Sequence, residues 1–504
     1  MKKILVHSVV ALFCLSGCGD SFLDLKPTNQ ILESEYYHTE DEIMQALVAA
    51  YQPLQWQDCS FSNQHHSFAM VSDVMGGDIR AGGGGTSDFP HFHLMREFKA
   101  TPEIICNSLW RVLYSGVNRA NIAIDKVGGV SDLSQDKAGR IKSEAMTLRA
   151  FYYYWLWKLW GNIPYYDKNL DASPYFAPQL KADEVYEKII GDLDAVLESN
   201  QLPVSVGEDL LGRITRPMVQ MLKASAVLYQ NDESRYQSAL SDMREIINSG
   251  RFDLADDFGG IWEETGEWCK ESIWEINYIE TGSRGWEPNI LVVGGTVYPQ
   301  TIGINGLRGS KYYQDGWGFG PVEPSLYNAY EEGDIRRDGG ILSWEVYHQK
   351  DPEATYDPRY DNTGFFNLKY MPRLGSNDQN TGDKIVNHNN NFRVFRYAET
   401  LMNAAELLVR TGGDLGEAKR YLSQIRDRAF AHQGNREIEP TLDNILNERR
   451  LEFALEGHRF WDLVRFGKAE TVLGPKGYAP NKKYLPIPAA EIDKSMGTLK
   501  QNPY

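Results

Sequence analysis

The stretch from Asn447 to Gly467 (NERRLEFALEGHRFWDLVRFG) restricts the possible folds most, because it combines helical spacing with charges set among large apolar side chains. Residues three to four positions apart share one helical face: Leu446, Arg450, Phe453 and Gly457. Charges of alternating sign recur at three-residue steps, at which helical side chains meet: Glu456, Arg459, Asp462 and Arg465. The pattern predicts a helix, a brief break near Gly457 and a second helical turn.

The acidic residues of this stretch have two possible roles, structural or catalytic. Bulky apolar side chains surround them: Phe453, Phe460, Trp461 and Phe466. Charged groups buried in such surroundings need partners of opposite sign. Because ordered ion-pair networks also bring carboxylates together, we interpret Glu448, Glu452 and Glu456 as structural members of such a network.

The N-terminus carries the features of a processing signal. Lys2 and Lys3 precede a mostly apolar run, and Leu15-Ser16-Gly17-Cys18 has the form of a lipobox. The motif predicts cleavage before Cys18 and acylation of its thiol; an ordinary secretory signal with an incidental cysteine is the alternative. We expect residues 1–17 to be a lipoprotein signal peptide and residues 18–38 to be a lipidated tether.

Four motifs together resemble a known family. Besides the opening stretch and the lipobox, they are Leu148–Tyr153 (LRAFYY), which continues to Leu159–Pro164 (LWGNIP), and Tyr484–Ile492 (YLPIPAAEI). Their order and placement over essentially the whole chain resemble the SusD/RagB family. Its members are surface glycan-binding lipoproteins that partner an outer-membrane TonB-dependent transporter. The resemblance implies a mostly α fold with a tetratricopeptide-like helical-repeat scaffold and long irregular ligand-binding loops.

Paired helical patterns agree with such a scaffold. Thr39 and Glu42 form a capping-box pattern at the start of the first helix. The segments 224–240 and 405–422 both contain a helix end, a short polar turn and an Ala-rich helix start. Helix pairs of this kind cannot bury their apolar faces alone and therefore stack. We expect an N-terminal helical half over residues 39–254 and a C-terminal helical part over residues 393–504.

Two regions lack the helical period. One is a loop insertion over residues 55–100, which contains a Gly82–Gly85 run that we interpret as flexible. The other is a loop-rich region over residues 255–392. Its many tryptophans indicate order, since disordered chains are poor in aromatic residues. Within it, Trp268 and Trp274 flank or occupy an alternating strand pattern, so we expect them in the core.

Charge and cysteine content exclude several classes of function. Cleavage after Gly17 would remove two of the 52 basic residues and none of the 69 acidic ones, which takes the formal charge from −17 to −19. Such a chain is a poor partner for nucleic acid or anionic lipid, and polyanionic glycans are mildly disfavoured. Three cysteines remain after Cys18, without C-x-x-C spacing: Cys59, Cys106 and Cys269. We expect no metal site and no cofactor; one disulfide among the three stays open.

The candidate ligand-binding residues lie in the two irregular regions. A pyranose ring packs its C–H face on an aromatic ring, and its hydroxyls bond to planar polar side chains. Residues 56–96 and 284–319 contain that mixture, on loops that a helical scaffold can present. We expect Trp286 and Trp317 to contact ligand above all, since glycines and polar residues flank them. The further candidates are Tyr312, Tyr313, Arg308, Asn305, Trp56, Asp78 and Arg80.

The function that the resemblance implies is capture of an oligosaccharide or polysaccharide and its delivery to a SusC-like transporter. The protein would be anchored in the outer membrane through Cys18 and would face the cell exterior. No catalysis is expected. The alternatives are a peptide ligand, which some members of this family take, a surface glycoside hydrolase, and a scaffold that only contacts the transporter.

Overall fold

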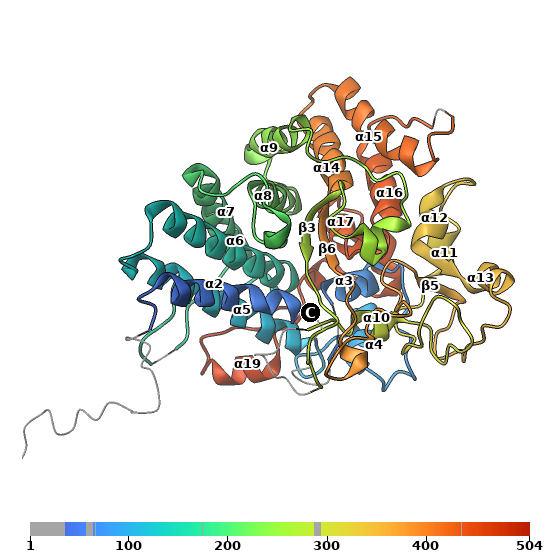
Figure 1. The fold of residues 1–504 in the computed structure, drawn as a ribbon, viewed down its shortest axis with the longest axis horizontal. Helices are drawn as coiled ribbons and strands as arrows, with labels where there is room; N and C mark the ends of the chain where they lie inside the picture. The colour runs from blue at the N-terminus through green and yellow to red at the C-terminus, as the bar shows by residue number, and fades with distance from the viewer. Residues whose placement is uncertain (1–35, 57–63, 66, 174, 287–293, 435) are drawn as a thin grey trace, which may run out of the picture.

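The computed structural model describes residues 36–56, 64–65, 67–173, 175–286, 294–434 and 436–504. Over these residues the chain is mostly helical, with a few short strands, which confirms the expected fold class. Figure 1 shows the blue to green helices of the N-terminal half on one side and the orange and red C-terminal helices beside them. The yellow, loop-rich segments lie along the opposite edge.

The N-terminal half is a stack of helices in which neighbours along the chain pack together. Its long helices are α2 (Glu40–Gln55), α5 (Asn107–Lys126), α6 (Gln135–Trp160), α7 (Ala182–Ser199), α8 (Arg216–Gln230) and α9 (Tyr236–Asn248). The expected capping box opens α2, where the Thr39 side chain accepts from the Glu42 backbone N–H and Glu42 accepts from that of Thr39. α6 packs against both α5 and α7, so its LRAFYY segment is buried on almost every side.

The C-terminal helices continue the stack. They are α14 (Tyr397–Arg410), α15 (Leu415–Ala429), α16 (Leu442–Glu452), α17 (Arg459–Arg465), α18 (Ala469–Leu473) and α19 (Ala489–Lys494). α14 packs on both α9 and α15 (Figure 1). One hydrophobic core therefore runs through both helical parts.

The sequence suggested that the insertion between residues 55 and 100 lacks helices, and this was wrong. It contains α3 (Phe68–Gly76) and α4 (Pro90–Arg96). All nine residues of α3 are buried, and the helix packs against α17, almost four hundred positions later in the chain. A helix that is buried all round has no polar face, so its sequence (FAMVSDVMG) carries no amphipathic period.

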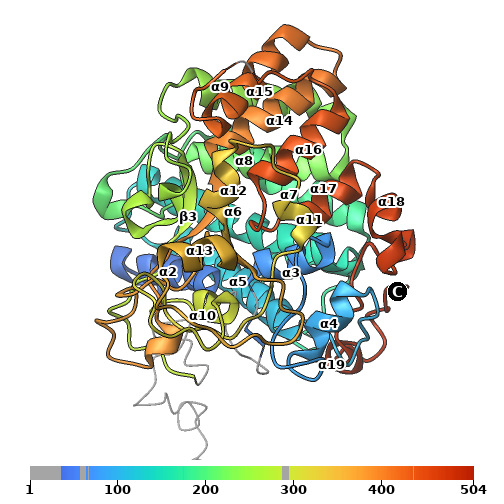
Figure 2. The same ribbon diagram turned by 90° about the vertical axis from the view of Figure 1, so that its right-hand side faces the viewer.

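Short elements linked by long loops make up the region between α9 and α14. Its helices are α10 (Tyr298–Ile302), α11 (Pro324–Tyr327), α12 (Ile335–Gly340) and α13 (Trp344–Lys350) (Figure 2). The short strands of the fold pair antiparallel: β1 (Ile163–Pro164) with β2 (Gln179–Leu180), β3 (Ser272–Ile276) with β6 (Phe392–Arg396), and β4 (Ile341–Ser343) with β5 (Phe365–Asn367). Trp274, on β3, is fully buried and Trp268 is partly buried against the core, as predicted.

The predicted break in the opening stretch separates α16 from α17. Gly457 has a φ of +83°, and its N–H donates to the Asp73 carboxylate at 3.1 Å. A Cβ at this position would lie 2.7 Å from the Cα of Ala69, in α3. The glycine is therefore required both by the left-handed backbone and by the close approach of α3.

Gly457→Ala is expected to lower the free energy of unfolding by roughly 2–4 kcal/mol, because left-handed strain and a clash with α3 add together. Gly467→Ala is the matched control. Gly467 also has a positive φ, of +68°, but a Cβ there would meet nothing within 4 Å, so we expect only about 1–2 kcal/mol. Urea denaturation of both variants measures the difference; equal losses would show that the approach of α3 is unimportant.

The charges of the opening stretch are paired, although mostly not with one another. Asp462 accepts from Arg465 at 2.9 Å, the expected three-residue step, and also from Arg449 at 3.0 Å. Glu456 instead accepts from Arg396 at 2.8 Å and from Lys369 at 2.6 Å. The structural interpretation of these acids therefore agrees with the observed contacts, with partners of Asp462 inside the stretch and partners of Glu456 on distant segments.

Cys106 and Cys269 are free thiols, whereas Cys59 lies outside the described residues, as do Cys18, the signal peptide and almost all of the expected tether. Among the helices that the structure describes, none is both long and apolar enough to cross a membrane.

Candidate functional site

Trp286 and Trp317 lie together, as two stacked rings. Their centroids are 5.9 Å apart and their planes differ by 22°. His65 stands edge-on to both, with its ring 5.6 Å from that of Trp286 and 5.9 Å from that of Trp317. The side chain of Trp286 is 42% exposed, whereas Trp317 is half-buried and His65 is buried. We call these three residues the aromatic shelf.

Polar contacts hold the two tryptophans in place. The indole N–H of Trp286 donates to the carboxylate of Asp383, 97 positions later. The backbone N–H of Trp317 donates to the Gln300 carbonyl at 2.8 Å, and its carbonyl accepts from Arg359 at 2.7 Å. Because these contacts engage the indole edge and the backbone, the flat face of an exposed ring stays available for a ligand.

A packed aromatic layer supports the shelf. The Phe89 ring lies 6.1 Å from that of His65 and stacks on Phe319 at 4.6 Å. Gly83 passes directly over Phe319, so a Cβ on Gly83 would lie 2.3 Å from the ring. Gly82 and Gly83 have φ values of +76° and +72°. The expectation that the Gly82–Gly85 run is simply a flexible link was therefore wrong, because its first two glycines permit close packing under the shelf.

Asn305 and Arg308 lie on the loop that leads to Trp317. Asn305 pairs through its backbone with Gly316, and its side-chain amide donates to the Asp357 carbonyl at 3.1 Å. Arg308 forms two hydrogen bonds with the Asp357 carboxylate, at 2.8 and 2.9 Å. This ion pair is well exposed, so water and a ligand can both reach it.

Tyr312 and Tyr313 belong to a different part of the loop region. Tyr313 packs on Tyr347 at 5.6 Å, against a small second hydrophobic cluster formed around Ile304 and Phe366. Tyr312, 56% exposed, contacts the ring of Tyr313. Of the five predicted aromatic residues, the structure therefore brings Trp286 and Trp317 together at the shelf and Tyr312 and Tyr313 together at this second cluster.

Three candidates from the earlier stretch have partners within the protein, and their role as ligand contacts stays a prediction. Trp56 is only 5% exposed and lies under the Arg119 guanidinium at 4.8 Å. Asp78 is buried and accepts from Arg450 at 2.5 Å. Arg80 contacts Glu323, which also accepts from Arg96. Loop composition alone did not show that Trp56 and Asp78 are buried, whereas Arg80 stays partly exposed.

The described histidines near the shelf, His65, His91 and His93, are buried. Burial lowers the pKa of His91 to about 4, and it also lowers the pKa of His93. Both are therefore neutral at pH 7. Among the described residues, His, Cys, Asp and Glu side chains nowhere gather in a group of three or more that could hold a metal ion.

Several residues of the site were not identified from the sequence. Asp383 and Arg359 orient the two tryptophans, and Phe89 supports His65. No local pattern marks them, since each acts on a residue far away in the chain. The mixture of Gly, Asn and aromatic residues indicated the region but not these contacts.

Two family models match the chain, one at each end. The model described as "SusD family" covers residues 342–504, and the one described as "Starch-binding associating with outer membrane" covers residues 21–217. A curated relative, SusD-like protein P2 from Formosa agariphila, is 26% identical, and the match spans the whole of both chains.

Two solved structures have the same fold at higher identity. Surface glycan-binding protein A from Bacteroides thetaiotaomicron, solved in complex with laminarihexaose, is 42% identical with a TM-score of 0.87. The match covers 92% of this chain and 100% of that one. A structure named laminarin binding SusD-like protein is 30% identical with a TM-score of 0.82, over 93% of this chain and 100% of that one.

Proposed function

This chain belongs to the SusD/RagB family, and from that premise we propose that it is a glycan-binding protein whose ligand is a neutral glucan of the laminarin type. The observation that carries the proposal is the aromatic shelf, where Trp286 and Trp317 offer stacked, accessible rings. Asn305, which pairs with Gly316 beside Trp317, and Asp383, which accepts from Trp286, border it with the planar polar groups that bond to hydroxyls, and Arg308 lies on the same loop as Asn305.

The choice of a neutral glucan has two supports. A protein named for laminarin and another solved with laminarihexaose share 30% and 42% identity with this chain over nearly its full length. The formal charge of −17 also disfavours polyanionic glycans, which would be repelled over the whole surface. Binding would come from stacking, hydrogen bonds and shape, without covalent chemistry.

The proposal extends to the place where binding occurs. A lipid on Cys18 would hold the protein in the outer membrane, and the bound glucan would pass to a SusC-like TonB-dependent transporter. The match to a model described as associating with the outer membrane supports this placement. Co-purification with an outer-membrane transporter from detergent extracts, compared between wild type and Cys18→Ala, tests both parts.

An equilibrium titration tests the ligand class. We expect purified protein to bind laminarihexaose saturably and to leave it intact, and to bind an equally long α-glucan or a uronic-acid oligosaccharide at least about tenfold more weakly. An extended peptide of similar mass is the control for the peptide alternative. Binding of the peptide without any glycan would overturn the proposal, and shortening of the oligosaccharide would instead indicate a hydrolase.

A further inference from the structure

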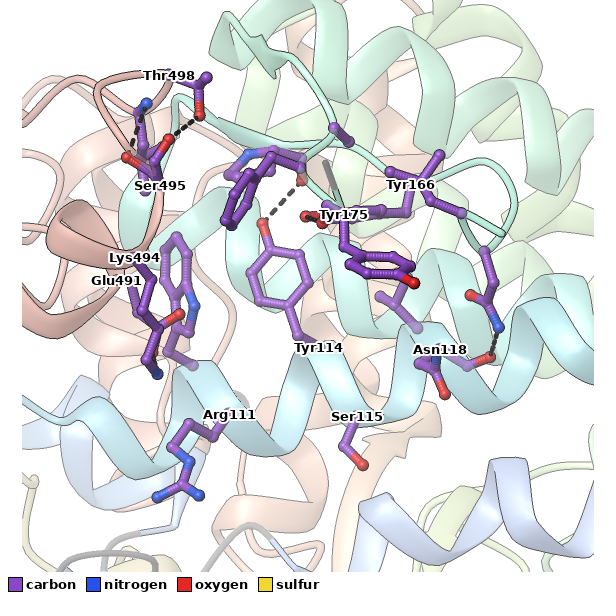
Figure 3. A pocket seen from close by; sticks show the side chains of 18 residues that line it. Arg111, Tyr114, Ser115, Asn118, Tyr166, Tyr175, Glu491, Lys494, Ser495 and Thr498 are labelled. Carbon is purple, nitrogen blue, oxygen red and sulfur yellow. Dashed lines mark hydrogen bonds and ion pairs between the residues drawn. The ribbon is translucent and has the colours of Figure 1, made fainter. Parts of the chain in front are cut away.

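A second cavity lies on the helical scaffold, separate from the aromatic shelf. It has a volume of about 520 Å³ and is bounded by α5, the segment after α6 and the α19 region (Figure 3). None of the residues that line it takes part in the shelf or in the layer beneath it. Its volume is within the range of about 300–1,000 Å³ in which proteins bind small ligands.

Aromatic rings form much of the lining. The hydroxyl of Tyr114 donates to the Pro164 carbonyl at 2.8 Å, which ties its polar end to the wall (Figure 3). Tyr166 stands edge-on to Tyr114, with the ring centroids 6.0 Å apart. Tyr175 is 61% exposed, and its backbone carbonyl accepts from the Tyr166 hydroxyl at 3.3 Å. An accessible tyrosine ring therefore stands at a cavity whose inner rings are already fixed.

The polar part of the lining is rich in uncharged groups. Asn169 donates to the Asn118 carbonyl at 3.1 Å, and Ser115 lies one helical turn before Asn118 on α5 (Figure 3). Lys494 pairs with Glu491 at 2.8 Å, so these two charges offset each other. Arg111 is the one further charged residue in the described lining. The cavity consequently has the character of a site for a neutral ligand with hydroxyl groups.

We propose that this cavity is a second binding site for a neutral oligosaccharide, with Tyr175 as its stacking residue and Asn118 and Asn169 as hydrogen-bonding residues. The inference rests on the proposed glucan-binding function and deepens it. A long glucan could then engage two sites on one protein, which would raise the overall affinity without a tighter contact at either site. A short oligosaccharide would reach only one of them.

Calorimetric titrations with laminarihexaose and with laminarin test this proposal. In the Trp286→Ala/Trp317→Ala variant, we expect weak, saturable binding of laminarihexaose that disappears when Tyr175→Ala is added. In the otherwise unchanged protein, Tyr175→Ala is expected to weaken laminarin binding about tenfold and to change laminarihexaose binding less than twofold. Tyr175→Phe should retain binding, because it keeps the ring.

Leu415→Ala serves as the control, since Leu415 is also exposed and lies outside both sites. Unchanged melting temperatures establish that the variants are folded. The proposal is overturned if the tryptophan variant has no residual binding and Tyr175→Ala leaves laminarin affinity unchanged. It is also overturned if Tyr175→Ala impairs only co-purification with the transporter, since the cavity would then dock protein. Wild-type binding of laminarihexaose would leave the proposed function standing in both cases.

Discussion

Replacing both shelf tryptophans, as Trp286→Ala/Trp317→Ala, is expected to lower the affinity for laminarihexaose at least about a hundredfold. In the proposed site each ring would offer a flat face to the ligand, and truncating a well-placed aromatic anchor typically costs about 2 kcal/mol or more. The two rings contact each other at 5.9 Å, so we expect the single variants to be non-additive. Calorimetry on the purified variants measures the loss.

Tyr312→Ala is the matched control, because Tyr312 is even more exposed than Trp286 but contacts the ring of Tyr313, which packs against the second hydrophobic cluster. We expect it to change the affinity less than about threefold. If Tyr312→Ala weakened binding as strongly as the tryptophan variant, the ligand would lie along the 305–315 loop instead. Circular dichroism and melting curves exclude unfolding as the cause.

Asp383 provides a second, independent check on the geometry of the shelf. Its carboxylate accepts the indole N–H of Trp286 but does not form the stacking surface. Asp383→Ala should therefore weaken binding by a smaller factor than Trp286→Ala, through loss of orientation of the ring. Asp383→Asn keeps an acceptor oxygen and should restore most of the affinity.

The largest effect on stability is expected from Arg396→Leu, which should lower the free energy of unfolding by about 3–5 kcal/mol. Arg396 is the last residue of β6 and is buried. Its guanidinium donates to three glutamates: Glu271, Glu452 and Glu456. Removing it leaves an excess of negative charge in a site that water does not reach. Urea denaturation monitored by tryptophan fluorescence measures the change.

Two further variants serve as comparisons for this prediction. Arg308→Leu removes an arginine whose ion pair is exposed, so we expect a loss below about 1 kcal/mol. Arg396→Lys keeps the charge but cannot donate to three carboxylates through a planar fork, so an intermediate loss is expected. A loss for Arg396→Leu no larger than that for Arg308→Leu would show that the buried network contributes little to folding.

The dependence of folding stability on pH tests the same network. Burial alone would raise the pKa of Glu452, but Arg428, Arg396 and Arg336 hold it well below its usual range. A carboxyl whose pKa is depressed in the folded state contributes stability above its unfolded pKa of about 4.3 and loses that contribution as the pH falls below it. The stability difference between wild type and Arg396→Leu should therefore shrink between pH 4.5 and pH 2.

The network also explains why the loop region and the helices form one unit. Arg336 lies in α12, Arg428 in α15 and Glu452 at the end of α16, and all three meet in the same buried site. Arg396 brings β6 into it. Since β6 pairs with β3, and the loop after β3 leads to the shelf, we expect network variants to loosen the ligand loops as well.

Local sequence patterns predicted the helices that have two distinct faces. The capping box at Thr39 opens α2, and the break at Gly457 separates α16 from α17. They failed for α3, which is apolar all round. They also did not show that Trp56 and Asp78 are buried, because a loop-like composition does not tell whether a side chain finds a partner inside the protein.

The sequence by itself determined the helical class and the family, since these depend on spacing and motifs, and it suggested Trp286 and Trp317 as stacking residues, which stays a prediction. Only the tertiary structure decided that Trp286 and Trp317 meet, that Asp383 orients one of them and that Gly83 makes room for Phe319. The cavity at Tyr175 is also a product of the fold. The physical reason is that such contacts join residues tens to hundreds of positions apart, where no local period or motif reports on distance.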